Sequence, residues 1–192
     1  DLRMSRGLGD VYKRQIKAGL VLAPEDRKKD GLCTRLSIAD NIALPNLDIL
    51  CEGLVGTVNR KKEKAMVDNA VKALKIKLPN AQVDAGSLSG GNQQKVVVAK
   101  WLARNSRVVI FDEPTRGIDV AAKVEIYNLM NQLKQNGIGV MFVSSEMPEV
   151  MGMSDRIIVM CDGRITGELS AEEATQDMIL TKATQFEQKT AL

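Results

Sequence analysis

The chain has 192 residues, of which 44% are hydrophobic and 27% are charged, with a formal net charge of +3. This length and composition indicate one substantial globular domain, or one domain with a small appendage, and exclude a disordered chain. The small net charge and the aromatic content of 3% argue against a nucleic-acid partner, because single-strand binders need rings on which bases can stack.

The sequence contains no apolar run that approaches the roughly 20 residues needed to cross a bilayer, so membrane contact is expected only through a partner. Cys33, Cys51 and Cys161 are scattered and lack C-x-x-C spacing, which fits a reducing compartment better than a disulfide scaffold. There is no histidine. Any chemistry is therefore expected to use carboxylates and backbone amides.

Residues 1–15, DLRMSRGLGDVYKRQ, show neither helical nor strand periodicity and resemble translated adapter sequence. They are expected to be non-native or disordered, the alternative being a frayed loop. From Ile16 onward, IKAGLVLAP predicts a strand that leads into a charged loop, EDRKKDG.

Two helices are predicted next. SIADNIAL reads as a short helix that Ser37 opens as N-cap and Pro45 closes. Residues from about Arg60 to Leu74 have the spacing of an amphipathic helix, and the RKKEK run at its start is expected to be a solvated face rather than a nucleic-acid patch.

The second half alternates helices with buried strands. A helix follows LSGGNQQK to about Arg104, RVVIFDEP is a strand, and Asp119 caps the helix VAAKVEIYNLMNQLKQ. GIGVMFVSS is a second strand, DRIIVM and ITGEL form a hairpin around CDGR, and Ser170 with Glu173 predicts a capping box for a last helix to about Leu180. This alternation predicts an α/β fold, with a mostly parallel sheet and helices on both faces.

Two acids end the strand RVVIFDEP. Asp112 and Glu113 come at its carboxyl end, where open α/β sheets bind ligands. One acid there can hold Mg²⁺ and its neighbour can orient or deprotonate a water that attacks a phosphoryl group. The alternative is a strand followed by an ordinary capping turn, because D-E-P is also good turn chemistry.

LSGGNQQK places two glycines directly before a predicted helix. The amino end of a helix carries unpaired N–H groups and partial positive charge, so it attracts phosphate. Gly90 and Gly91 allow close backbone approach, and Ser89 adds a hydroxyl donor. The alternative is an ordinary N-cap with a glycine hinge. The sequence nevertheless lacks G-x-x-x-x-G-K-[ST], the loop that usually cradles nucleotide phosphates.

Taken in order, LSGG, a helix, hhhhDE and a later Asp resemble the ABC-type ATPases from about residue 15 to about residue 180. The resemblance implies a P-loop NTPase-like domain whose Walker A strand and loop are missing. It implies that Asp112 ends the Walker B strand, Glu113 is the catalytic base and Asp119 belongs to the D-loop. It also divides the chain into a core strand and Q-loop region (16–36), a small helical subdomain (37–87), the signature, Walker B, D-loop and switch region (88–182) and a tail (183–192).

In this family two nucleotide domains pair head to tail, and each signature contacts the γ-phosphate held by the other domain. The resemblance thus implies that Ser89, Gly90, Gly91 and Asn92 bind an ATP anchored elsewhere. PEDRKKDG, LSGGNQQK, DEPTRGIDV and VSSEMPEV further resemble the second ATPase half of sugar importers of the ribose, xylose and galactose type.

Three positions depart from the general pattern. Asn92 replaces the usual signature Gln, Glu25 stands near the Q-loop glutamine that approaches Mg²⁺, and Ser145 stands in place of the switch histidine. Because a serine cannot become cationic, it stabilises developing phosphate charge less than histidine would. A composite site of reduced activity is therefore expected.

The resemblance implies ATP and Mg²⁺ as ligands and a partner nucleotide-binding half upstream in the same polypeptide. It also implies membrane permease subunits, an indirect link to a periplasmic sugar-binding protein, and a peripheral location at the cytoplasmic face of the membrane. The segment that would hold the P-loop is expected just upstream of residues 1–15.

Two alternatives stay open. One is a catalytically weak, regulatory ABC half, which Ser145 and Asn92 favour and Glu113 opposes. The other is a soluble ABC ATPase that acts on ribosomes or DNA, but such members usually show D-E-P-T-N-H-L-D where this chain has D-E-P-T-R-G-I-D.

Overall fold

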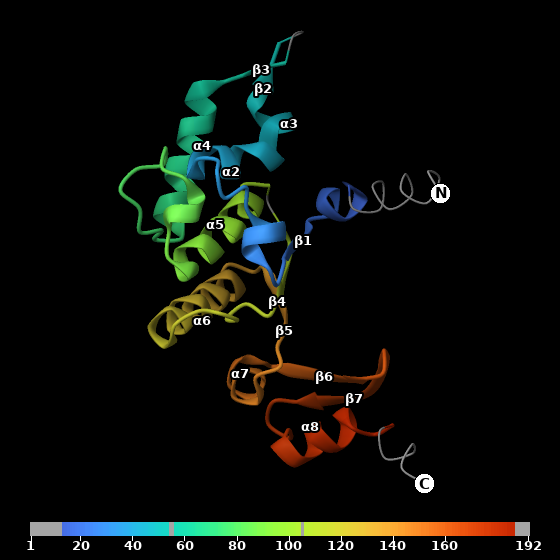
Figure 1. The fold of residues 1–192 in the computed structure, drawn as a ribbon. Coiled ribbons are helices and arrows are strands. Elements are labelled where there is room, and N and C mark those ends of the chain that lie inside the picture. The colour runs from blue at the N-terminus through green and yellow to red at the C-terminus, as the bar shows by residue number, and fades with distance from the viewer. Residues whose placement is uncertain (1–12, 54–55, 105, 187–192) are drawn as a thin grey trace, which may run out of the picture. The chain divides into compact units, whose positions relative to one another are not determined.

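The computed structural model describes residues 13–53, 56–104 and 106–186. Most of the predicted terminal segments 1–15 and 183–192 lies outside these ranges. The chain forms two compact units, Asp1–Val143 and Ser144–Leu192, here called unit 1 and unit 2. Both are drawn in Figure 1.

Unit 1 begins, within the described residues, with a helical stretch at 13–17. Its further elements in chain order are β1 (Leu20–Ala23), η1 (Arg27–Gly31), α2 (Ile38–Ala43), η2 (Leu44–Asn46), α3 (Leu47–Leu50), β2 (Cys51–Glu52), β3 (Thr57–Val58), α4 (Arg60–Ala73), η3 (Ala85–Ser87), α5 (Gly90–Leu102), β4 (Val108–Asp112), α6 (Val120–Gln135) and β5 (Gly139–Val143).

The central sheet of unit 1 has the order β1-β4-β5 and is parallel throughout. Its register pairs Ala23 with Phe111 and Phe111 with Phe142. The α/β fold with a parallel sheet flanked by helices, expected from the alternating pattern, is confirmed.

One face of this sheet holds the core. Val21, Ala23, Val109 and Phe111 are at most 4% exposed. Helix α5 packs against β1, and α6 packs against both β5 and α5. Successive side chains of a strand point to opposite faces of the sheet. Every second apolar residue of these strands therefore lies on the face that the two helices cover.

The opposite face of the sheet is open within unit 1. Leu22, Met141 and Val143 are 41%, 53% and 49% exposed, and Leu22 is in register with Ile110 and Met141. The prediction of helices on both faces is therefore wrong for the described residues of unit 1. Strand β5 is also an edge, with β4 as its one partner.

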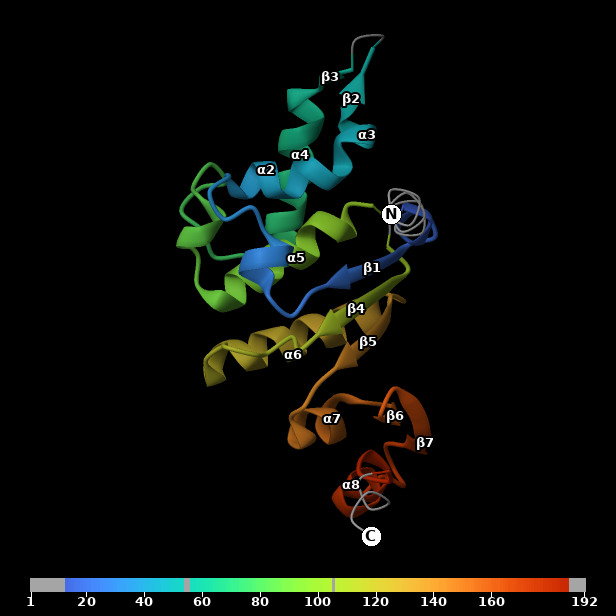
Figure 2. The same cartoon turned by 45° about the vertical axis from the view of Figure 1, so that its right-hand side comes forward.

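Helix α5 joins the sheet to a group of helices formed by α2, α3 and α4. It packs against α2 and α4 as well as against β1 and α6, and Figures 1 and 2 both show the helical group on the far side of α5 from the sheet. Ser37 caps α2 by accepting a hydrogen bond from the Asp40 amide, so this predicted cap is confirmed.

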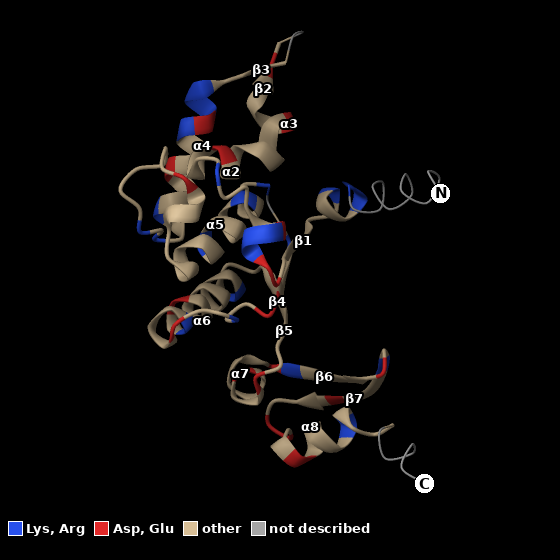
Figure 3. Cartoon of the chain, viewed as in Figure 1, with Lys and Arg blue, Asp and Glu red and all other residues tan. Residues whose placement is uncertain are grey.

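The basic run at the start of α4 is exposed, as predicted. Lys61, Lys62 and Lys64 are all exposed, and Arg60 pairs with Glu63 one turn later. Figure 3 shows this end of α4 in blue. Of the predicted apolar face Met66, Ala70, Val71 and Leu74, only Leu74 is buried and the other three are half-buried; Val67 is also buried.

Two local predictions near the start are wrong. Residues 16 and 17 belong to a helical stretch at 13–17 rather than to a strand, and strand β1 begins only at Leu20, after Gly19 ends the helix with φ of +83°. The charged segment after β1 is not an open loop but a π-helical turn, because Asp26 caps it by accepting from the amides of Lys28 and Lys29.

Unit 2 contains α7 (Met147–Met153), β6 (Arg156–Cys161), β7 (Arg164–Ser170) and α8 (Gln176–Ala183). The predicted hairpin is confirmed, since β6 and β7 pair antiparallel. Ile157, Val159, Leu169 and Ile179 form its small core.

The predicted start of the last helix is wrong. Ser170 does accept a hydrogen bond from the Glu173 amide, but this contact closes a turn. Helix α8 begins at Gln176 because Thr175 caps it, accepting from the Met178 amide. Across both units, none of the described helices is long and apolar enough to cross a membrane.

Candidate functional site

The LSGG segment forms the amino end of α5, a helix of 13 residues. Ser89 occupies the N-cap position with extended backbone, yet its side chain makes no capping hydrogen bond. The N–H groups of a first helical turn have no acceptor inside the helix. They are therefore left for a group outside α5, which suits an anion.

The two glycines allow close packing on two sides. A Cβ on Gly90 would lie 2.8 Å from Nη2 of Arg27, and a Cβ on Gly91 would lie 3.0 Å from the Cβ of Ala122 on α6. A Cβ at position 90 would make the Arg27 guanidinium shift, and a Cβ at position 91 would make Ala122 give way by a few tenths of an ångström. The glycines thus serve the packing around the helix end as well as its accessibility.

The Asn92 side chain is used inside the protein. Its Nδ2 donates to Oγ of Ser89 at 3.0 Å, and its Oδ1 accepts from the Lys77 amide at 2.9 Å. Asn92 is 8% exposed. The residue therefore orients the Ser89 hydroxyl. It also ties residues 88–92, here called the signature turn after the motif that they resemble, to the chain that follows α4.

Strand β4 ends at Asp112, and Glu113 follows in an unusual conformation. Asp112 is half-buried and in register with Val143 on β5. Glu113 has φ of +46°, and its amide donates to the Val143 carbonyl at 2.9 Å. A left-handed backbone at a residue other than glycine is strained and occurs disproportionately at functional sites.

Asp119 caps α6, as the sequence predicted, by accepting from the Ala122 amide at 2.9 Å. It lies at the end of the loop that starts at Glu113. The same loop carries Gly117, whose carbonyl oxygen lies 3.7 Å from the Cβ position of Gly90. The structure thus brings the signature turn and the loop after β4 together.

Glu25 lies in the turn after β1, where it forms an ion pair with Arg116. Among the described residues there is no group of three or more acidic, cysteine or histidine side chains that could hold a metal. Asp112 remains a hard oxygen donor of the kind that Mg²⁺ prefers. The Glu25 carboxylate, by contrast, is already paired with the guanidinium of Arg116.

Ser145 belongs to unit 2, where it lies exposed between β5 and α7. Its neighbour Ser144 contacts Glu149 and also accepts from the Glu146 amide at 3.0 Å.

Sequence reasoning missed Arg27. Its guanidinium donates to Gln93 on α5 and to the carbonyls of Arg116 and Gly117. In the sequence, Arg27 is one of three consecutive basic residues in a charged segment, so no spacing signal separated it from Lys28 and Lys29.

Sequence reasoning also missed a charge cluster between α5 and α6. Lys95 is buried and its Nζ lies 2.9 Å from Glu125, which also pairs with Lys77 at 2.9 Å. The Lys95 ammonium, followed by that of Lys77, lowers the pKa of Glu125 to about 2. This cluster links the signature helix to the helix after the Asp112–Asp119 segment.

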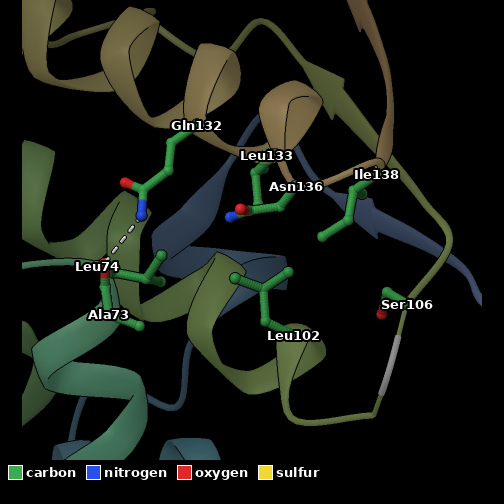
Figure 4. Close-up of a pocket in the computed structure, with 8 residues that line it drawn as sticks. All are labelled: Ala73, Leu74, Leu102, Ser106, Gln132, Leu133, Asn136 and Ile138. Carbon is green, nitrogen blue, oxygen red and sulfur yellow. Dashed lines mark hydrogen bonds between the residues drawn. The ribbon is translucent and has the colours of Figure 1, made fainter.

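The hollow drawn in Figure 4 lies elsewhere in unit 1. A shallow cavity of about 350 Å³ lies between the carboxyl ends of α4, α5 and α6 (Figure 4), where Gln132 donates to the Ala73 carbonyl at 3.4 Å. None of the predicted site residues lines it. The candidate site is instead an open surface, formed by the turns around Gly90 and Gly117.

A family model described as "ABC transporter" matches residues 9–116, more than half of the chain. The ribose import ATP-binding protein RbsA of Bacillus subtilis is 52% identical over 169 residues, which cover 88% of this chain and 34% of the relative. The xylose import ATP-binding protein XylG of Thermoanaerobacter pseudethanolicus is also 52% identical, covering 88% of this chain and 33% of its own length. The chain therefore spans about a third of the length of these relatives.

Solved structures agree on the fold. A dimeric ATP-binding cassette in a post-hydrolysis state with ADP and Pi has a TM-score of 0.64 at 24% identity, covering 79% of this chain and 62% of its own. A second ATP-binding cassette of an ABC transporter has a TM-score of 0.69 at 20% identity, covering 90% of this chain and 70% of its own.

Proposed function

Because the chain belongs to the ABC transporter family, we propose that it is an ATP-binding part of an importer, coupling ATP binding and hydrolysis to monosaccharide uptake. The strong likeness to ribose and xylose import ATP-binding proteins carries this proposal. Of the sequence motifs that suggested it, LSGGNQQK forms the start of α5, and VVIFDEP forms β4 and the start of the loop whose Gly117 lies next to Gly90.

The amino end of α5 is proposed to bind the terminal phosphate of an ATP held by a facing nucleotide-binding half. The uncapped first turn of α5 supports this role, because its N–H groups and the helix dipole both favour an anion. Asn92 supports it further by directing the Ser89 hydroxyl. The nucleotide would then join two halves, and hydrolysis would weaken their contact.

Asp112 and Glu113 are proposed to act on the ATP of this half. Asp112 would hold Mg²⁺, which supplies charge neutralisation at the phosphates when bound. Glu113 would accept a proton from the attacking water, or orient that water. Its strained, left-handed backbone supports this catalytic role, because such strain occurs disproportionately at functional sites.

The complete protein is proposed to carry a second nucleotide-binding half upstream of this one and to act at the cytoplasmic face of the membrane, bound to permease subunits. A periplasmic sugar-binding protein would deliver the monosaccharide. These partners follow from the import function named in the relatives.

The proposal is tested by replacing Glu113 in the complete protein, reconstituted with its permease subunits. Glu113→Gln keeps the size of the side chain but removes the base, so ATP turnover at this half is expected to fall about 100-fold or more. Glu172→Gln, an exposed acid in unit 2, serves as the matched control. Full ATPase activity and sugar uptake in Glu113→Gln would refute the assignment.

Ser145, in unit 2, gives a second test of the proposed function. Ser145→His is expected to raise turnover at this half severalfold, because an imidazolium stabilises phosphate charge better than a hydroxyl. Ser145→Ala is the control and should give no gain. Steady-state ATPase assays compare the three proteins, and an unchanged or lower rate in Ser145→His would count against the proposed switch position.

A regulatory half with little turnover is the second candidate. It is favoured by the ion pair between Glu25 and Arg116, which already engages a carboxylate expected near Mg²⁺. In that case Glu113→Gln would leave total turnover nearly unchanged, whereas Ser89→Arg, which blocks the amino end of α5, would still reduce it.

A further inference from the structure

We infer that Arg27 is a positioning residue that holds the signature turn and the loop after β4 in one fixed arrangement. The inference rests on the proposed function for its catalytic consequence, but its structural part concerns this chain alone.

The contacts of Arg27 reach two separate segments. Nε donates to Oε1 of Gln93 on α5 at 3.4 Å, Nη1 donates to the Arg116 carbonyl at 3.1 Å, and Nη2 donates to the Gly117 carbonyl at 3.3 Å. A guanidinium offers five donors in a rigid planar fork, which one ammonium cannot reproduce. Arg27 therefore joins the start of α5 to the Glu113–Asp119 loop.

Gln93 extends this link into the signature turn. It is 2% exposed, and its Nε2 donates to the Leu88 carbonyl at 3.0 Å and the Gly86 carbonyl at 3.2 Å. Hydrogen bonds from Arg27 to Gln93 and from Gln93 to Leu88 thus connect the turn after β1 to the residue that precedes Ser89. The position of Ser89 depends on a side chain 62 residues earlier in the chain.

A reciprocal contact fixes the same two loops. Glu25 pairs with the Arg116 side chain, while Arg27 binds the Arg116 main chain. The Arg116 and Glu25 side chains are 69% and 43% exposed, so this ion pair alone contributes little. Arg27 is half-buried and adds three hydrogen bonds to this one ion pair.

Gly90 completes the arrangement. The Arg27 Nη2 atom lies 2.8 Å from the position that a Gly90 Cβ would occupy. A Cβ at position 90 would make the Arg27 guanidinium shift from the place where it reaches the Gly117 carbonyl, so glycine at this position leaves room for that contact. One signature glycine is therefore explained by an internal contact as well as by approach to a phosphate.

The test is hydrogen exchange of the complete protein without nucleotide. Arg27→Ala is expected to speed amide exchange about tenfold in peptides covering residues 86–93 and 113–119, as the loss of about one net hydrogen bond predicts. Lys29→Ala, which removes the same charge from the same turn, should leave both peptides unchanged. A peptide from α2 provides the internal reference.

Exchange within twofold of wild type in both peptides of Arg27→Ala would overturn the inference. If Arg27→Ala also speeds exchange in α2, the fold as a whole has loosened, and Arg27→Lys decides instead. It keeps the charge and the aliphatic stem but not the fork. Faster exchange limited to the two peptides supports the inference, and unchanged exchange in Arg27→Lys refutes it.

A double substitution tests the Gly90 contact. Gly90→Ala should speed exchange of residues 113–119 in the wild-type background, because the methyl group displaces Arg27. In the Arg27→Ala background the same change should add nothing further. Such non-additivity marks residues that act through one contact, whereas independent effects would show that Gly90 and Arg27 act separately.

ATP turnover supplies the functional arm. kcat is expected to fall about tenfold in Arg27→Ala and to recover partly in Arg27→Lys, with Lys29→Ala unaffected. A wild-type complete protein that hydrolyses no ATP would sink the proposed function, and the exchange measurement would still decide the role of Arg27. Normal kcat with faster exchange would limit Arg27 to a structural role and overturn the positioning claim.

Discussion

At the scale of single residues, hydrogen bonds decide how each predicted site residue is used. Asn92 was expected to face a nucleotide, but its amide is committed to Ser89 and to the chain after α4. Glu25 was expected near Mg²⁺, but it pairs with Arg116. Sequence identifies the chemical type at each position, whereas the partner that a side chain takes depends on segments far away in the chain.

Removing the Asn92 side chain should weaken unit 1. Asn92→Ala leaves the Lys77 amide without its acceptor and frees the Ser89 hydroxyl, so the free energy of unfolding should fall by about 1–2 kcal/mol. Urea denaturation of the complete protein measures the change. Asn80→Ala, in an exposed segment, is the comparison, and equal stability of Asn92→Ala and wild type would contradict the assigned contacts.

Glu125 should make stability depend on acid pH. Its pKa is lowered from an ordinary 4.5 to about 2, so the stabilisation from its ion pairs is complete above about pH 4.5 and is lost as pH falls toward 2. Glu125→Gln should remove this dependence and cost about 1–2 kcal/mol near neutral pH, because buried Lys95 loses its partner. Denaturation curves measured from pH 2 to pH 7 test both statements, because they cover both pKa values of Glu125 and extend to neutral pH.

Helices and strands were predicted best where a cap or a buried strand marked them. The Ser37 and Asp119 caps, the strand before Asp112 and the β6–β7 hairpin all form as expected. Errors occur where two local signals compete. Ser170 offers a capping box, but Thr175 caps α8, and Gly19 divides an apolar run into a helix and a strand.

Asp119 caps α6, and substitutions can separate this role from the D-loop role that the sequence resemblance implies. As the cap of α6 it should contribute about 1 kcal/mol, which Asp119→Ala removes and Asp119→Asn largely keeps. Unfolding of the nucleotide-free protein measures this difference. If ATPase activity falls equally in both variants, the carboxylate itself acts at the D-loop position, whereas activity that follows stability would assign Asp119 to capping alone.

At the scale of the whole molecule, the open side of the sheet limits what the 192-residue chain can do alone. Leu22, Met141 and Val143 are exposed on one face, and no strand among the described residues pairs with the outer edge of β5. Such edges pair with other chains unless they are covered. The sequence showed these strands to be apolar but could not show which face would remain uncovered.

The isolated chain is therefore expected to aggregate and to hydrolyse no ATP, since it also lacks a P-loop motif. Light scattering during thermal melting, compared with the complete protein, tests the first statement, and a phosphate-release assay tests the second. A soluble chain that melts cooperatively and releases phosphate from ATP would contradict both.

The left-handed backbone of Glu113 should influence which substitutions raise the thermal stability of the protein. Glycine or asparagine adopts φ of +46° at less cost than glutamate, so either replacement should raise the melting temperature of the complete protein. Selection for heat resistance alone is then expected to enrich these residues at position 113 and to discard turnover in the same step. If glutamate were retained at position 113 after such a selection, contacts of its side chain, rather than its backbone conformation, would determine the thermal stability at this position.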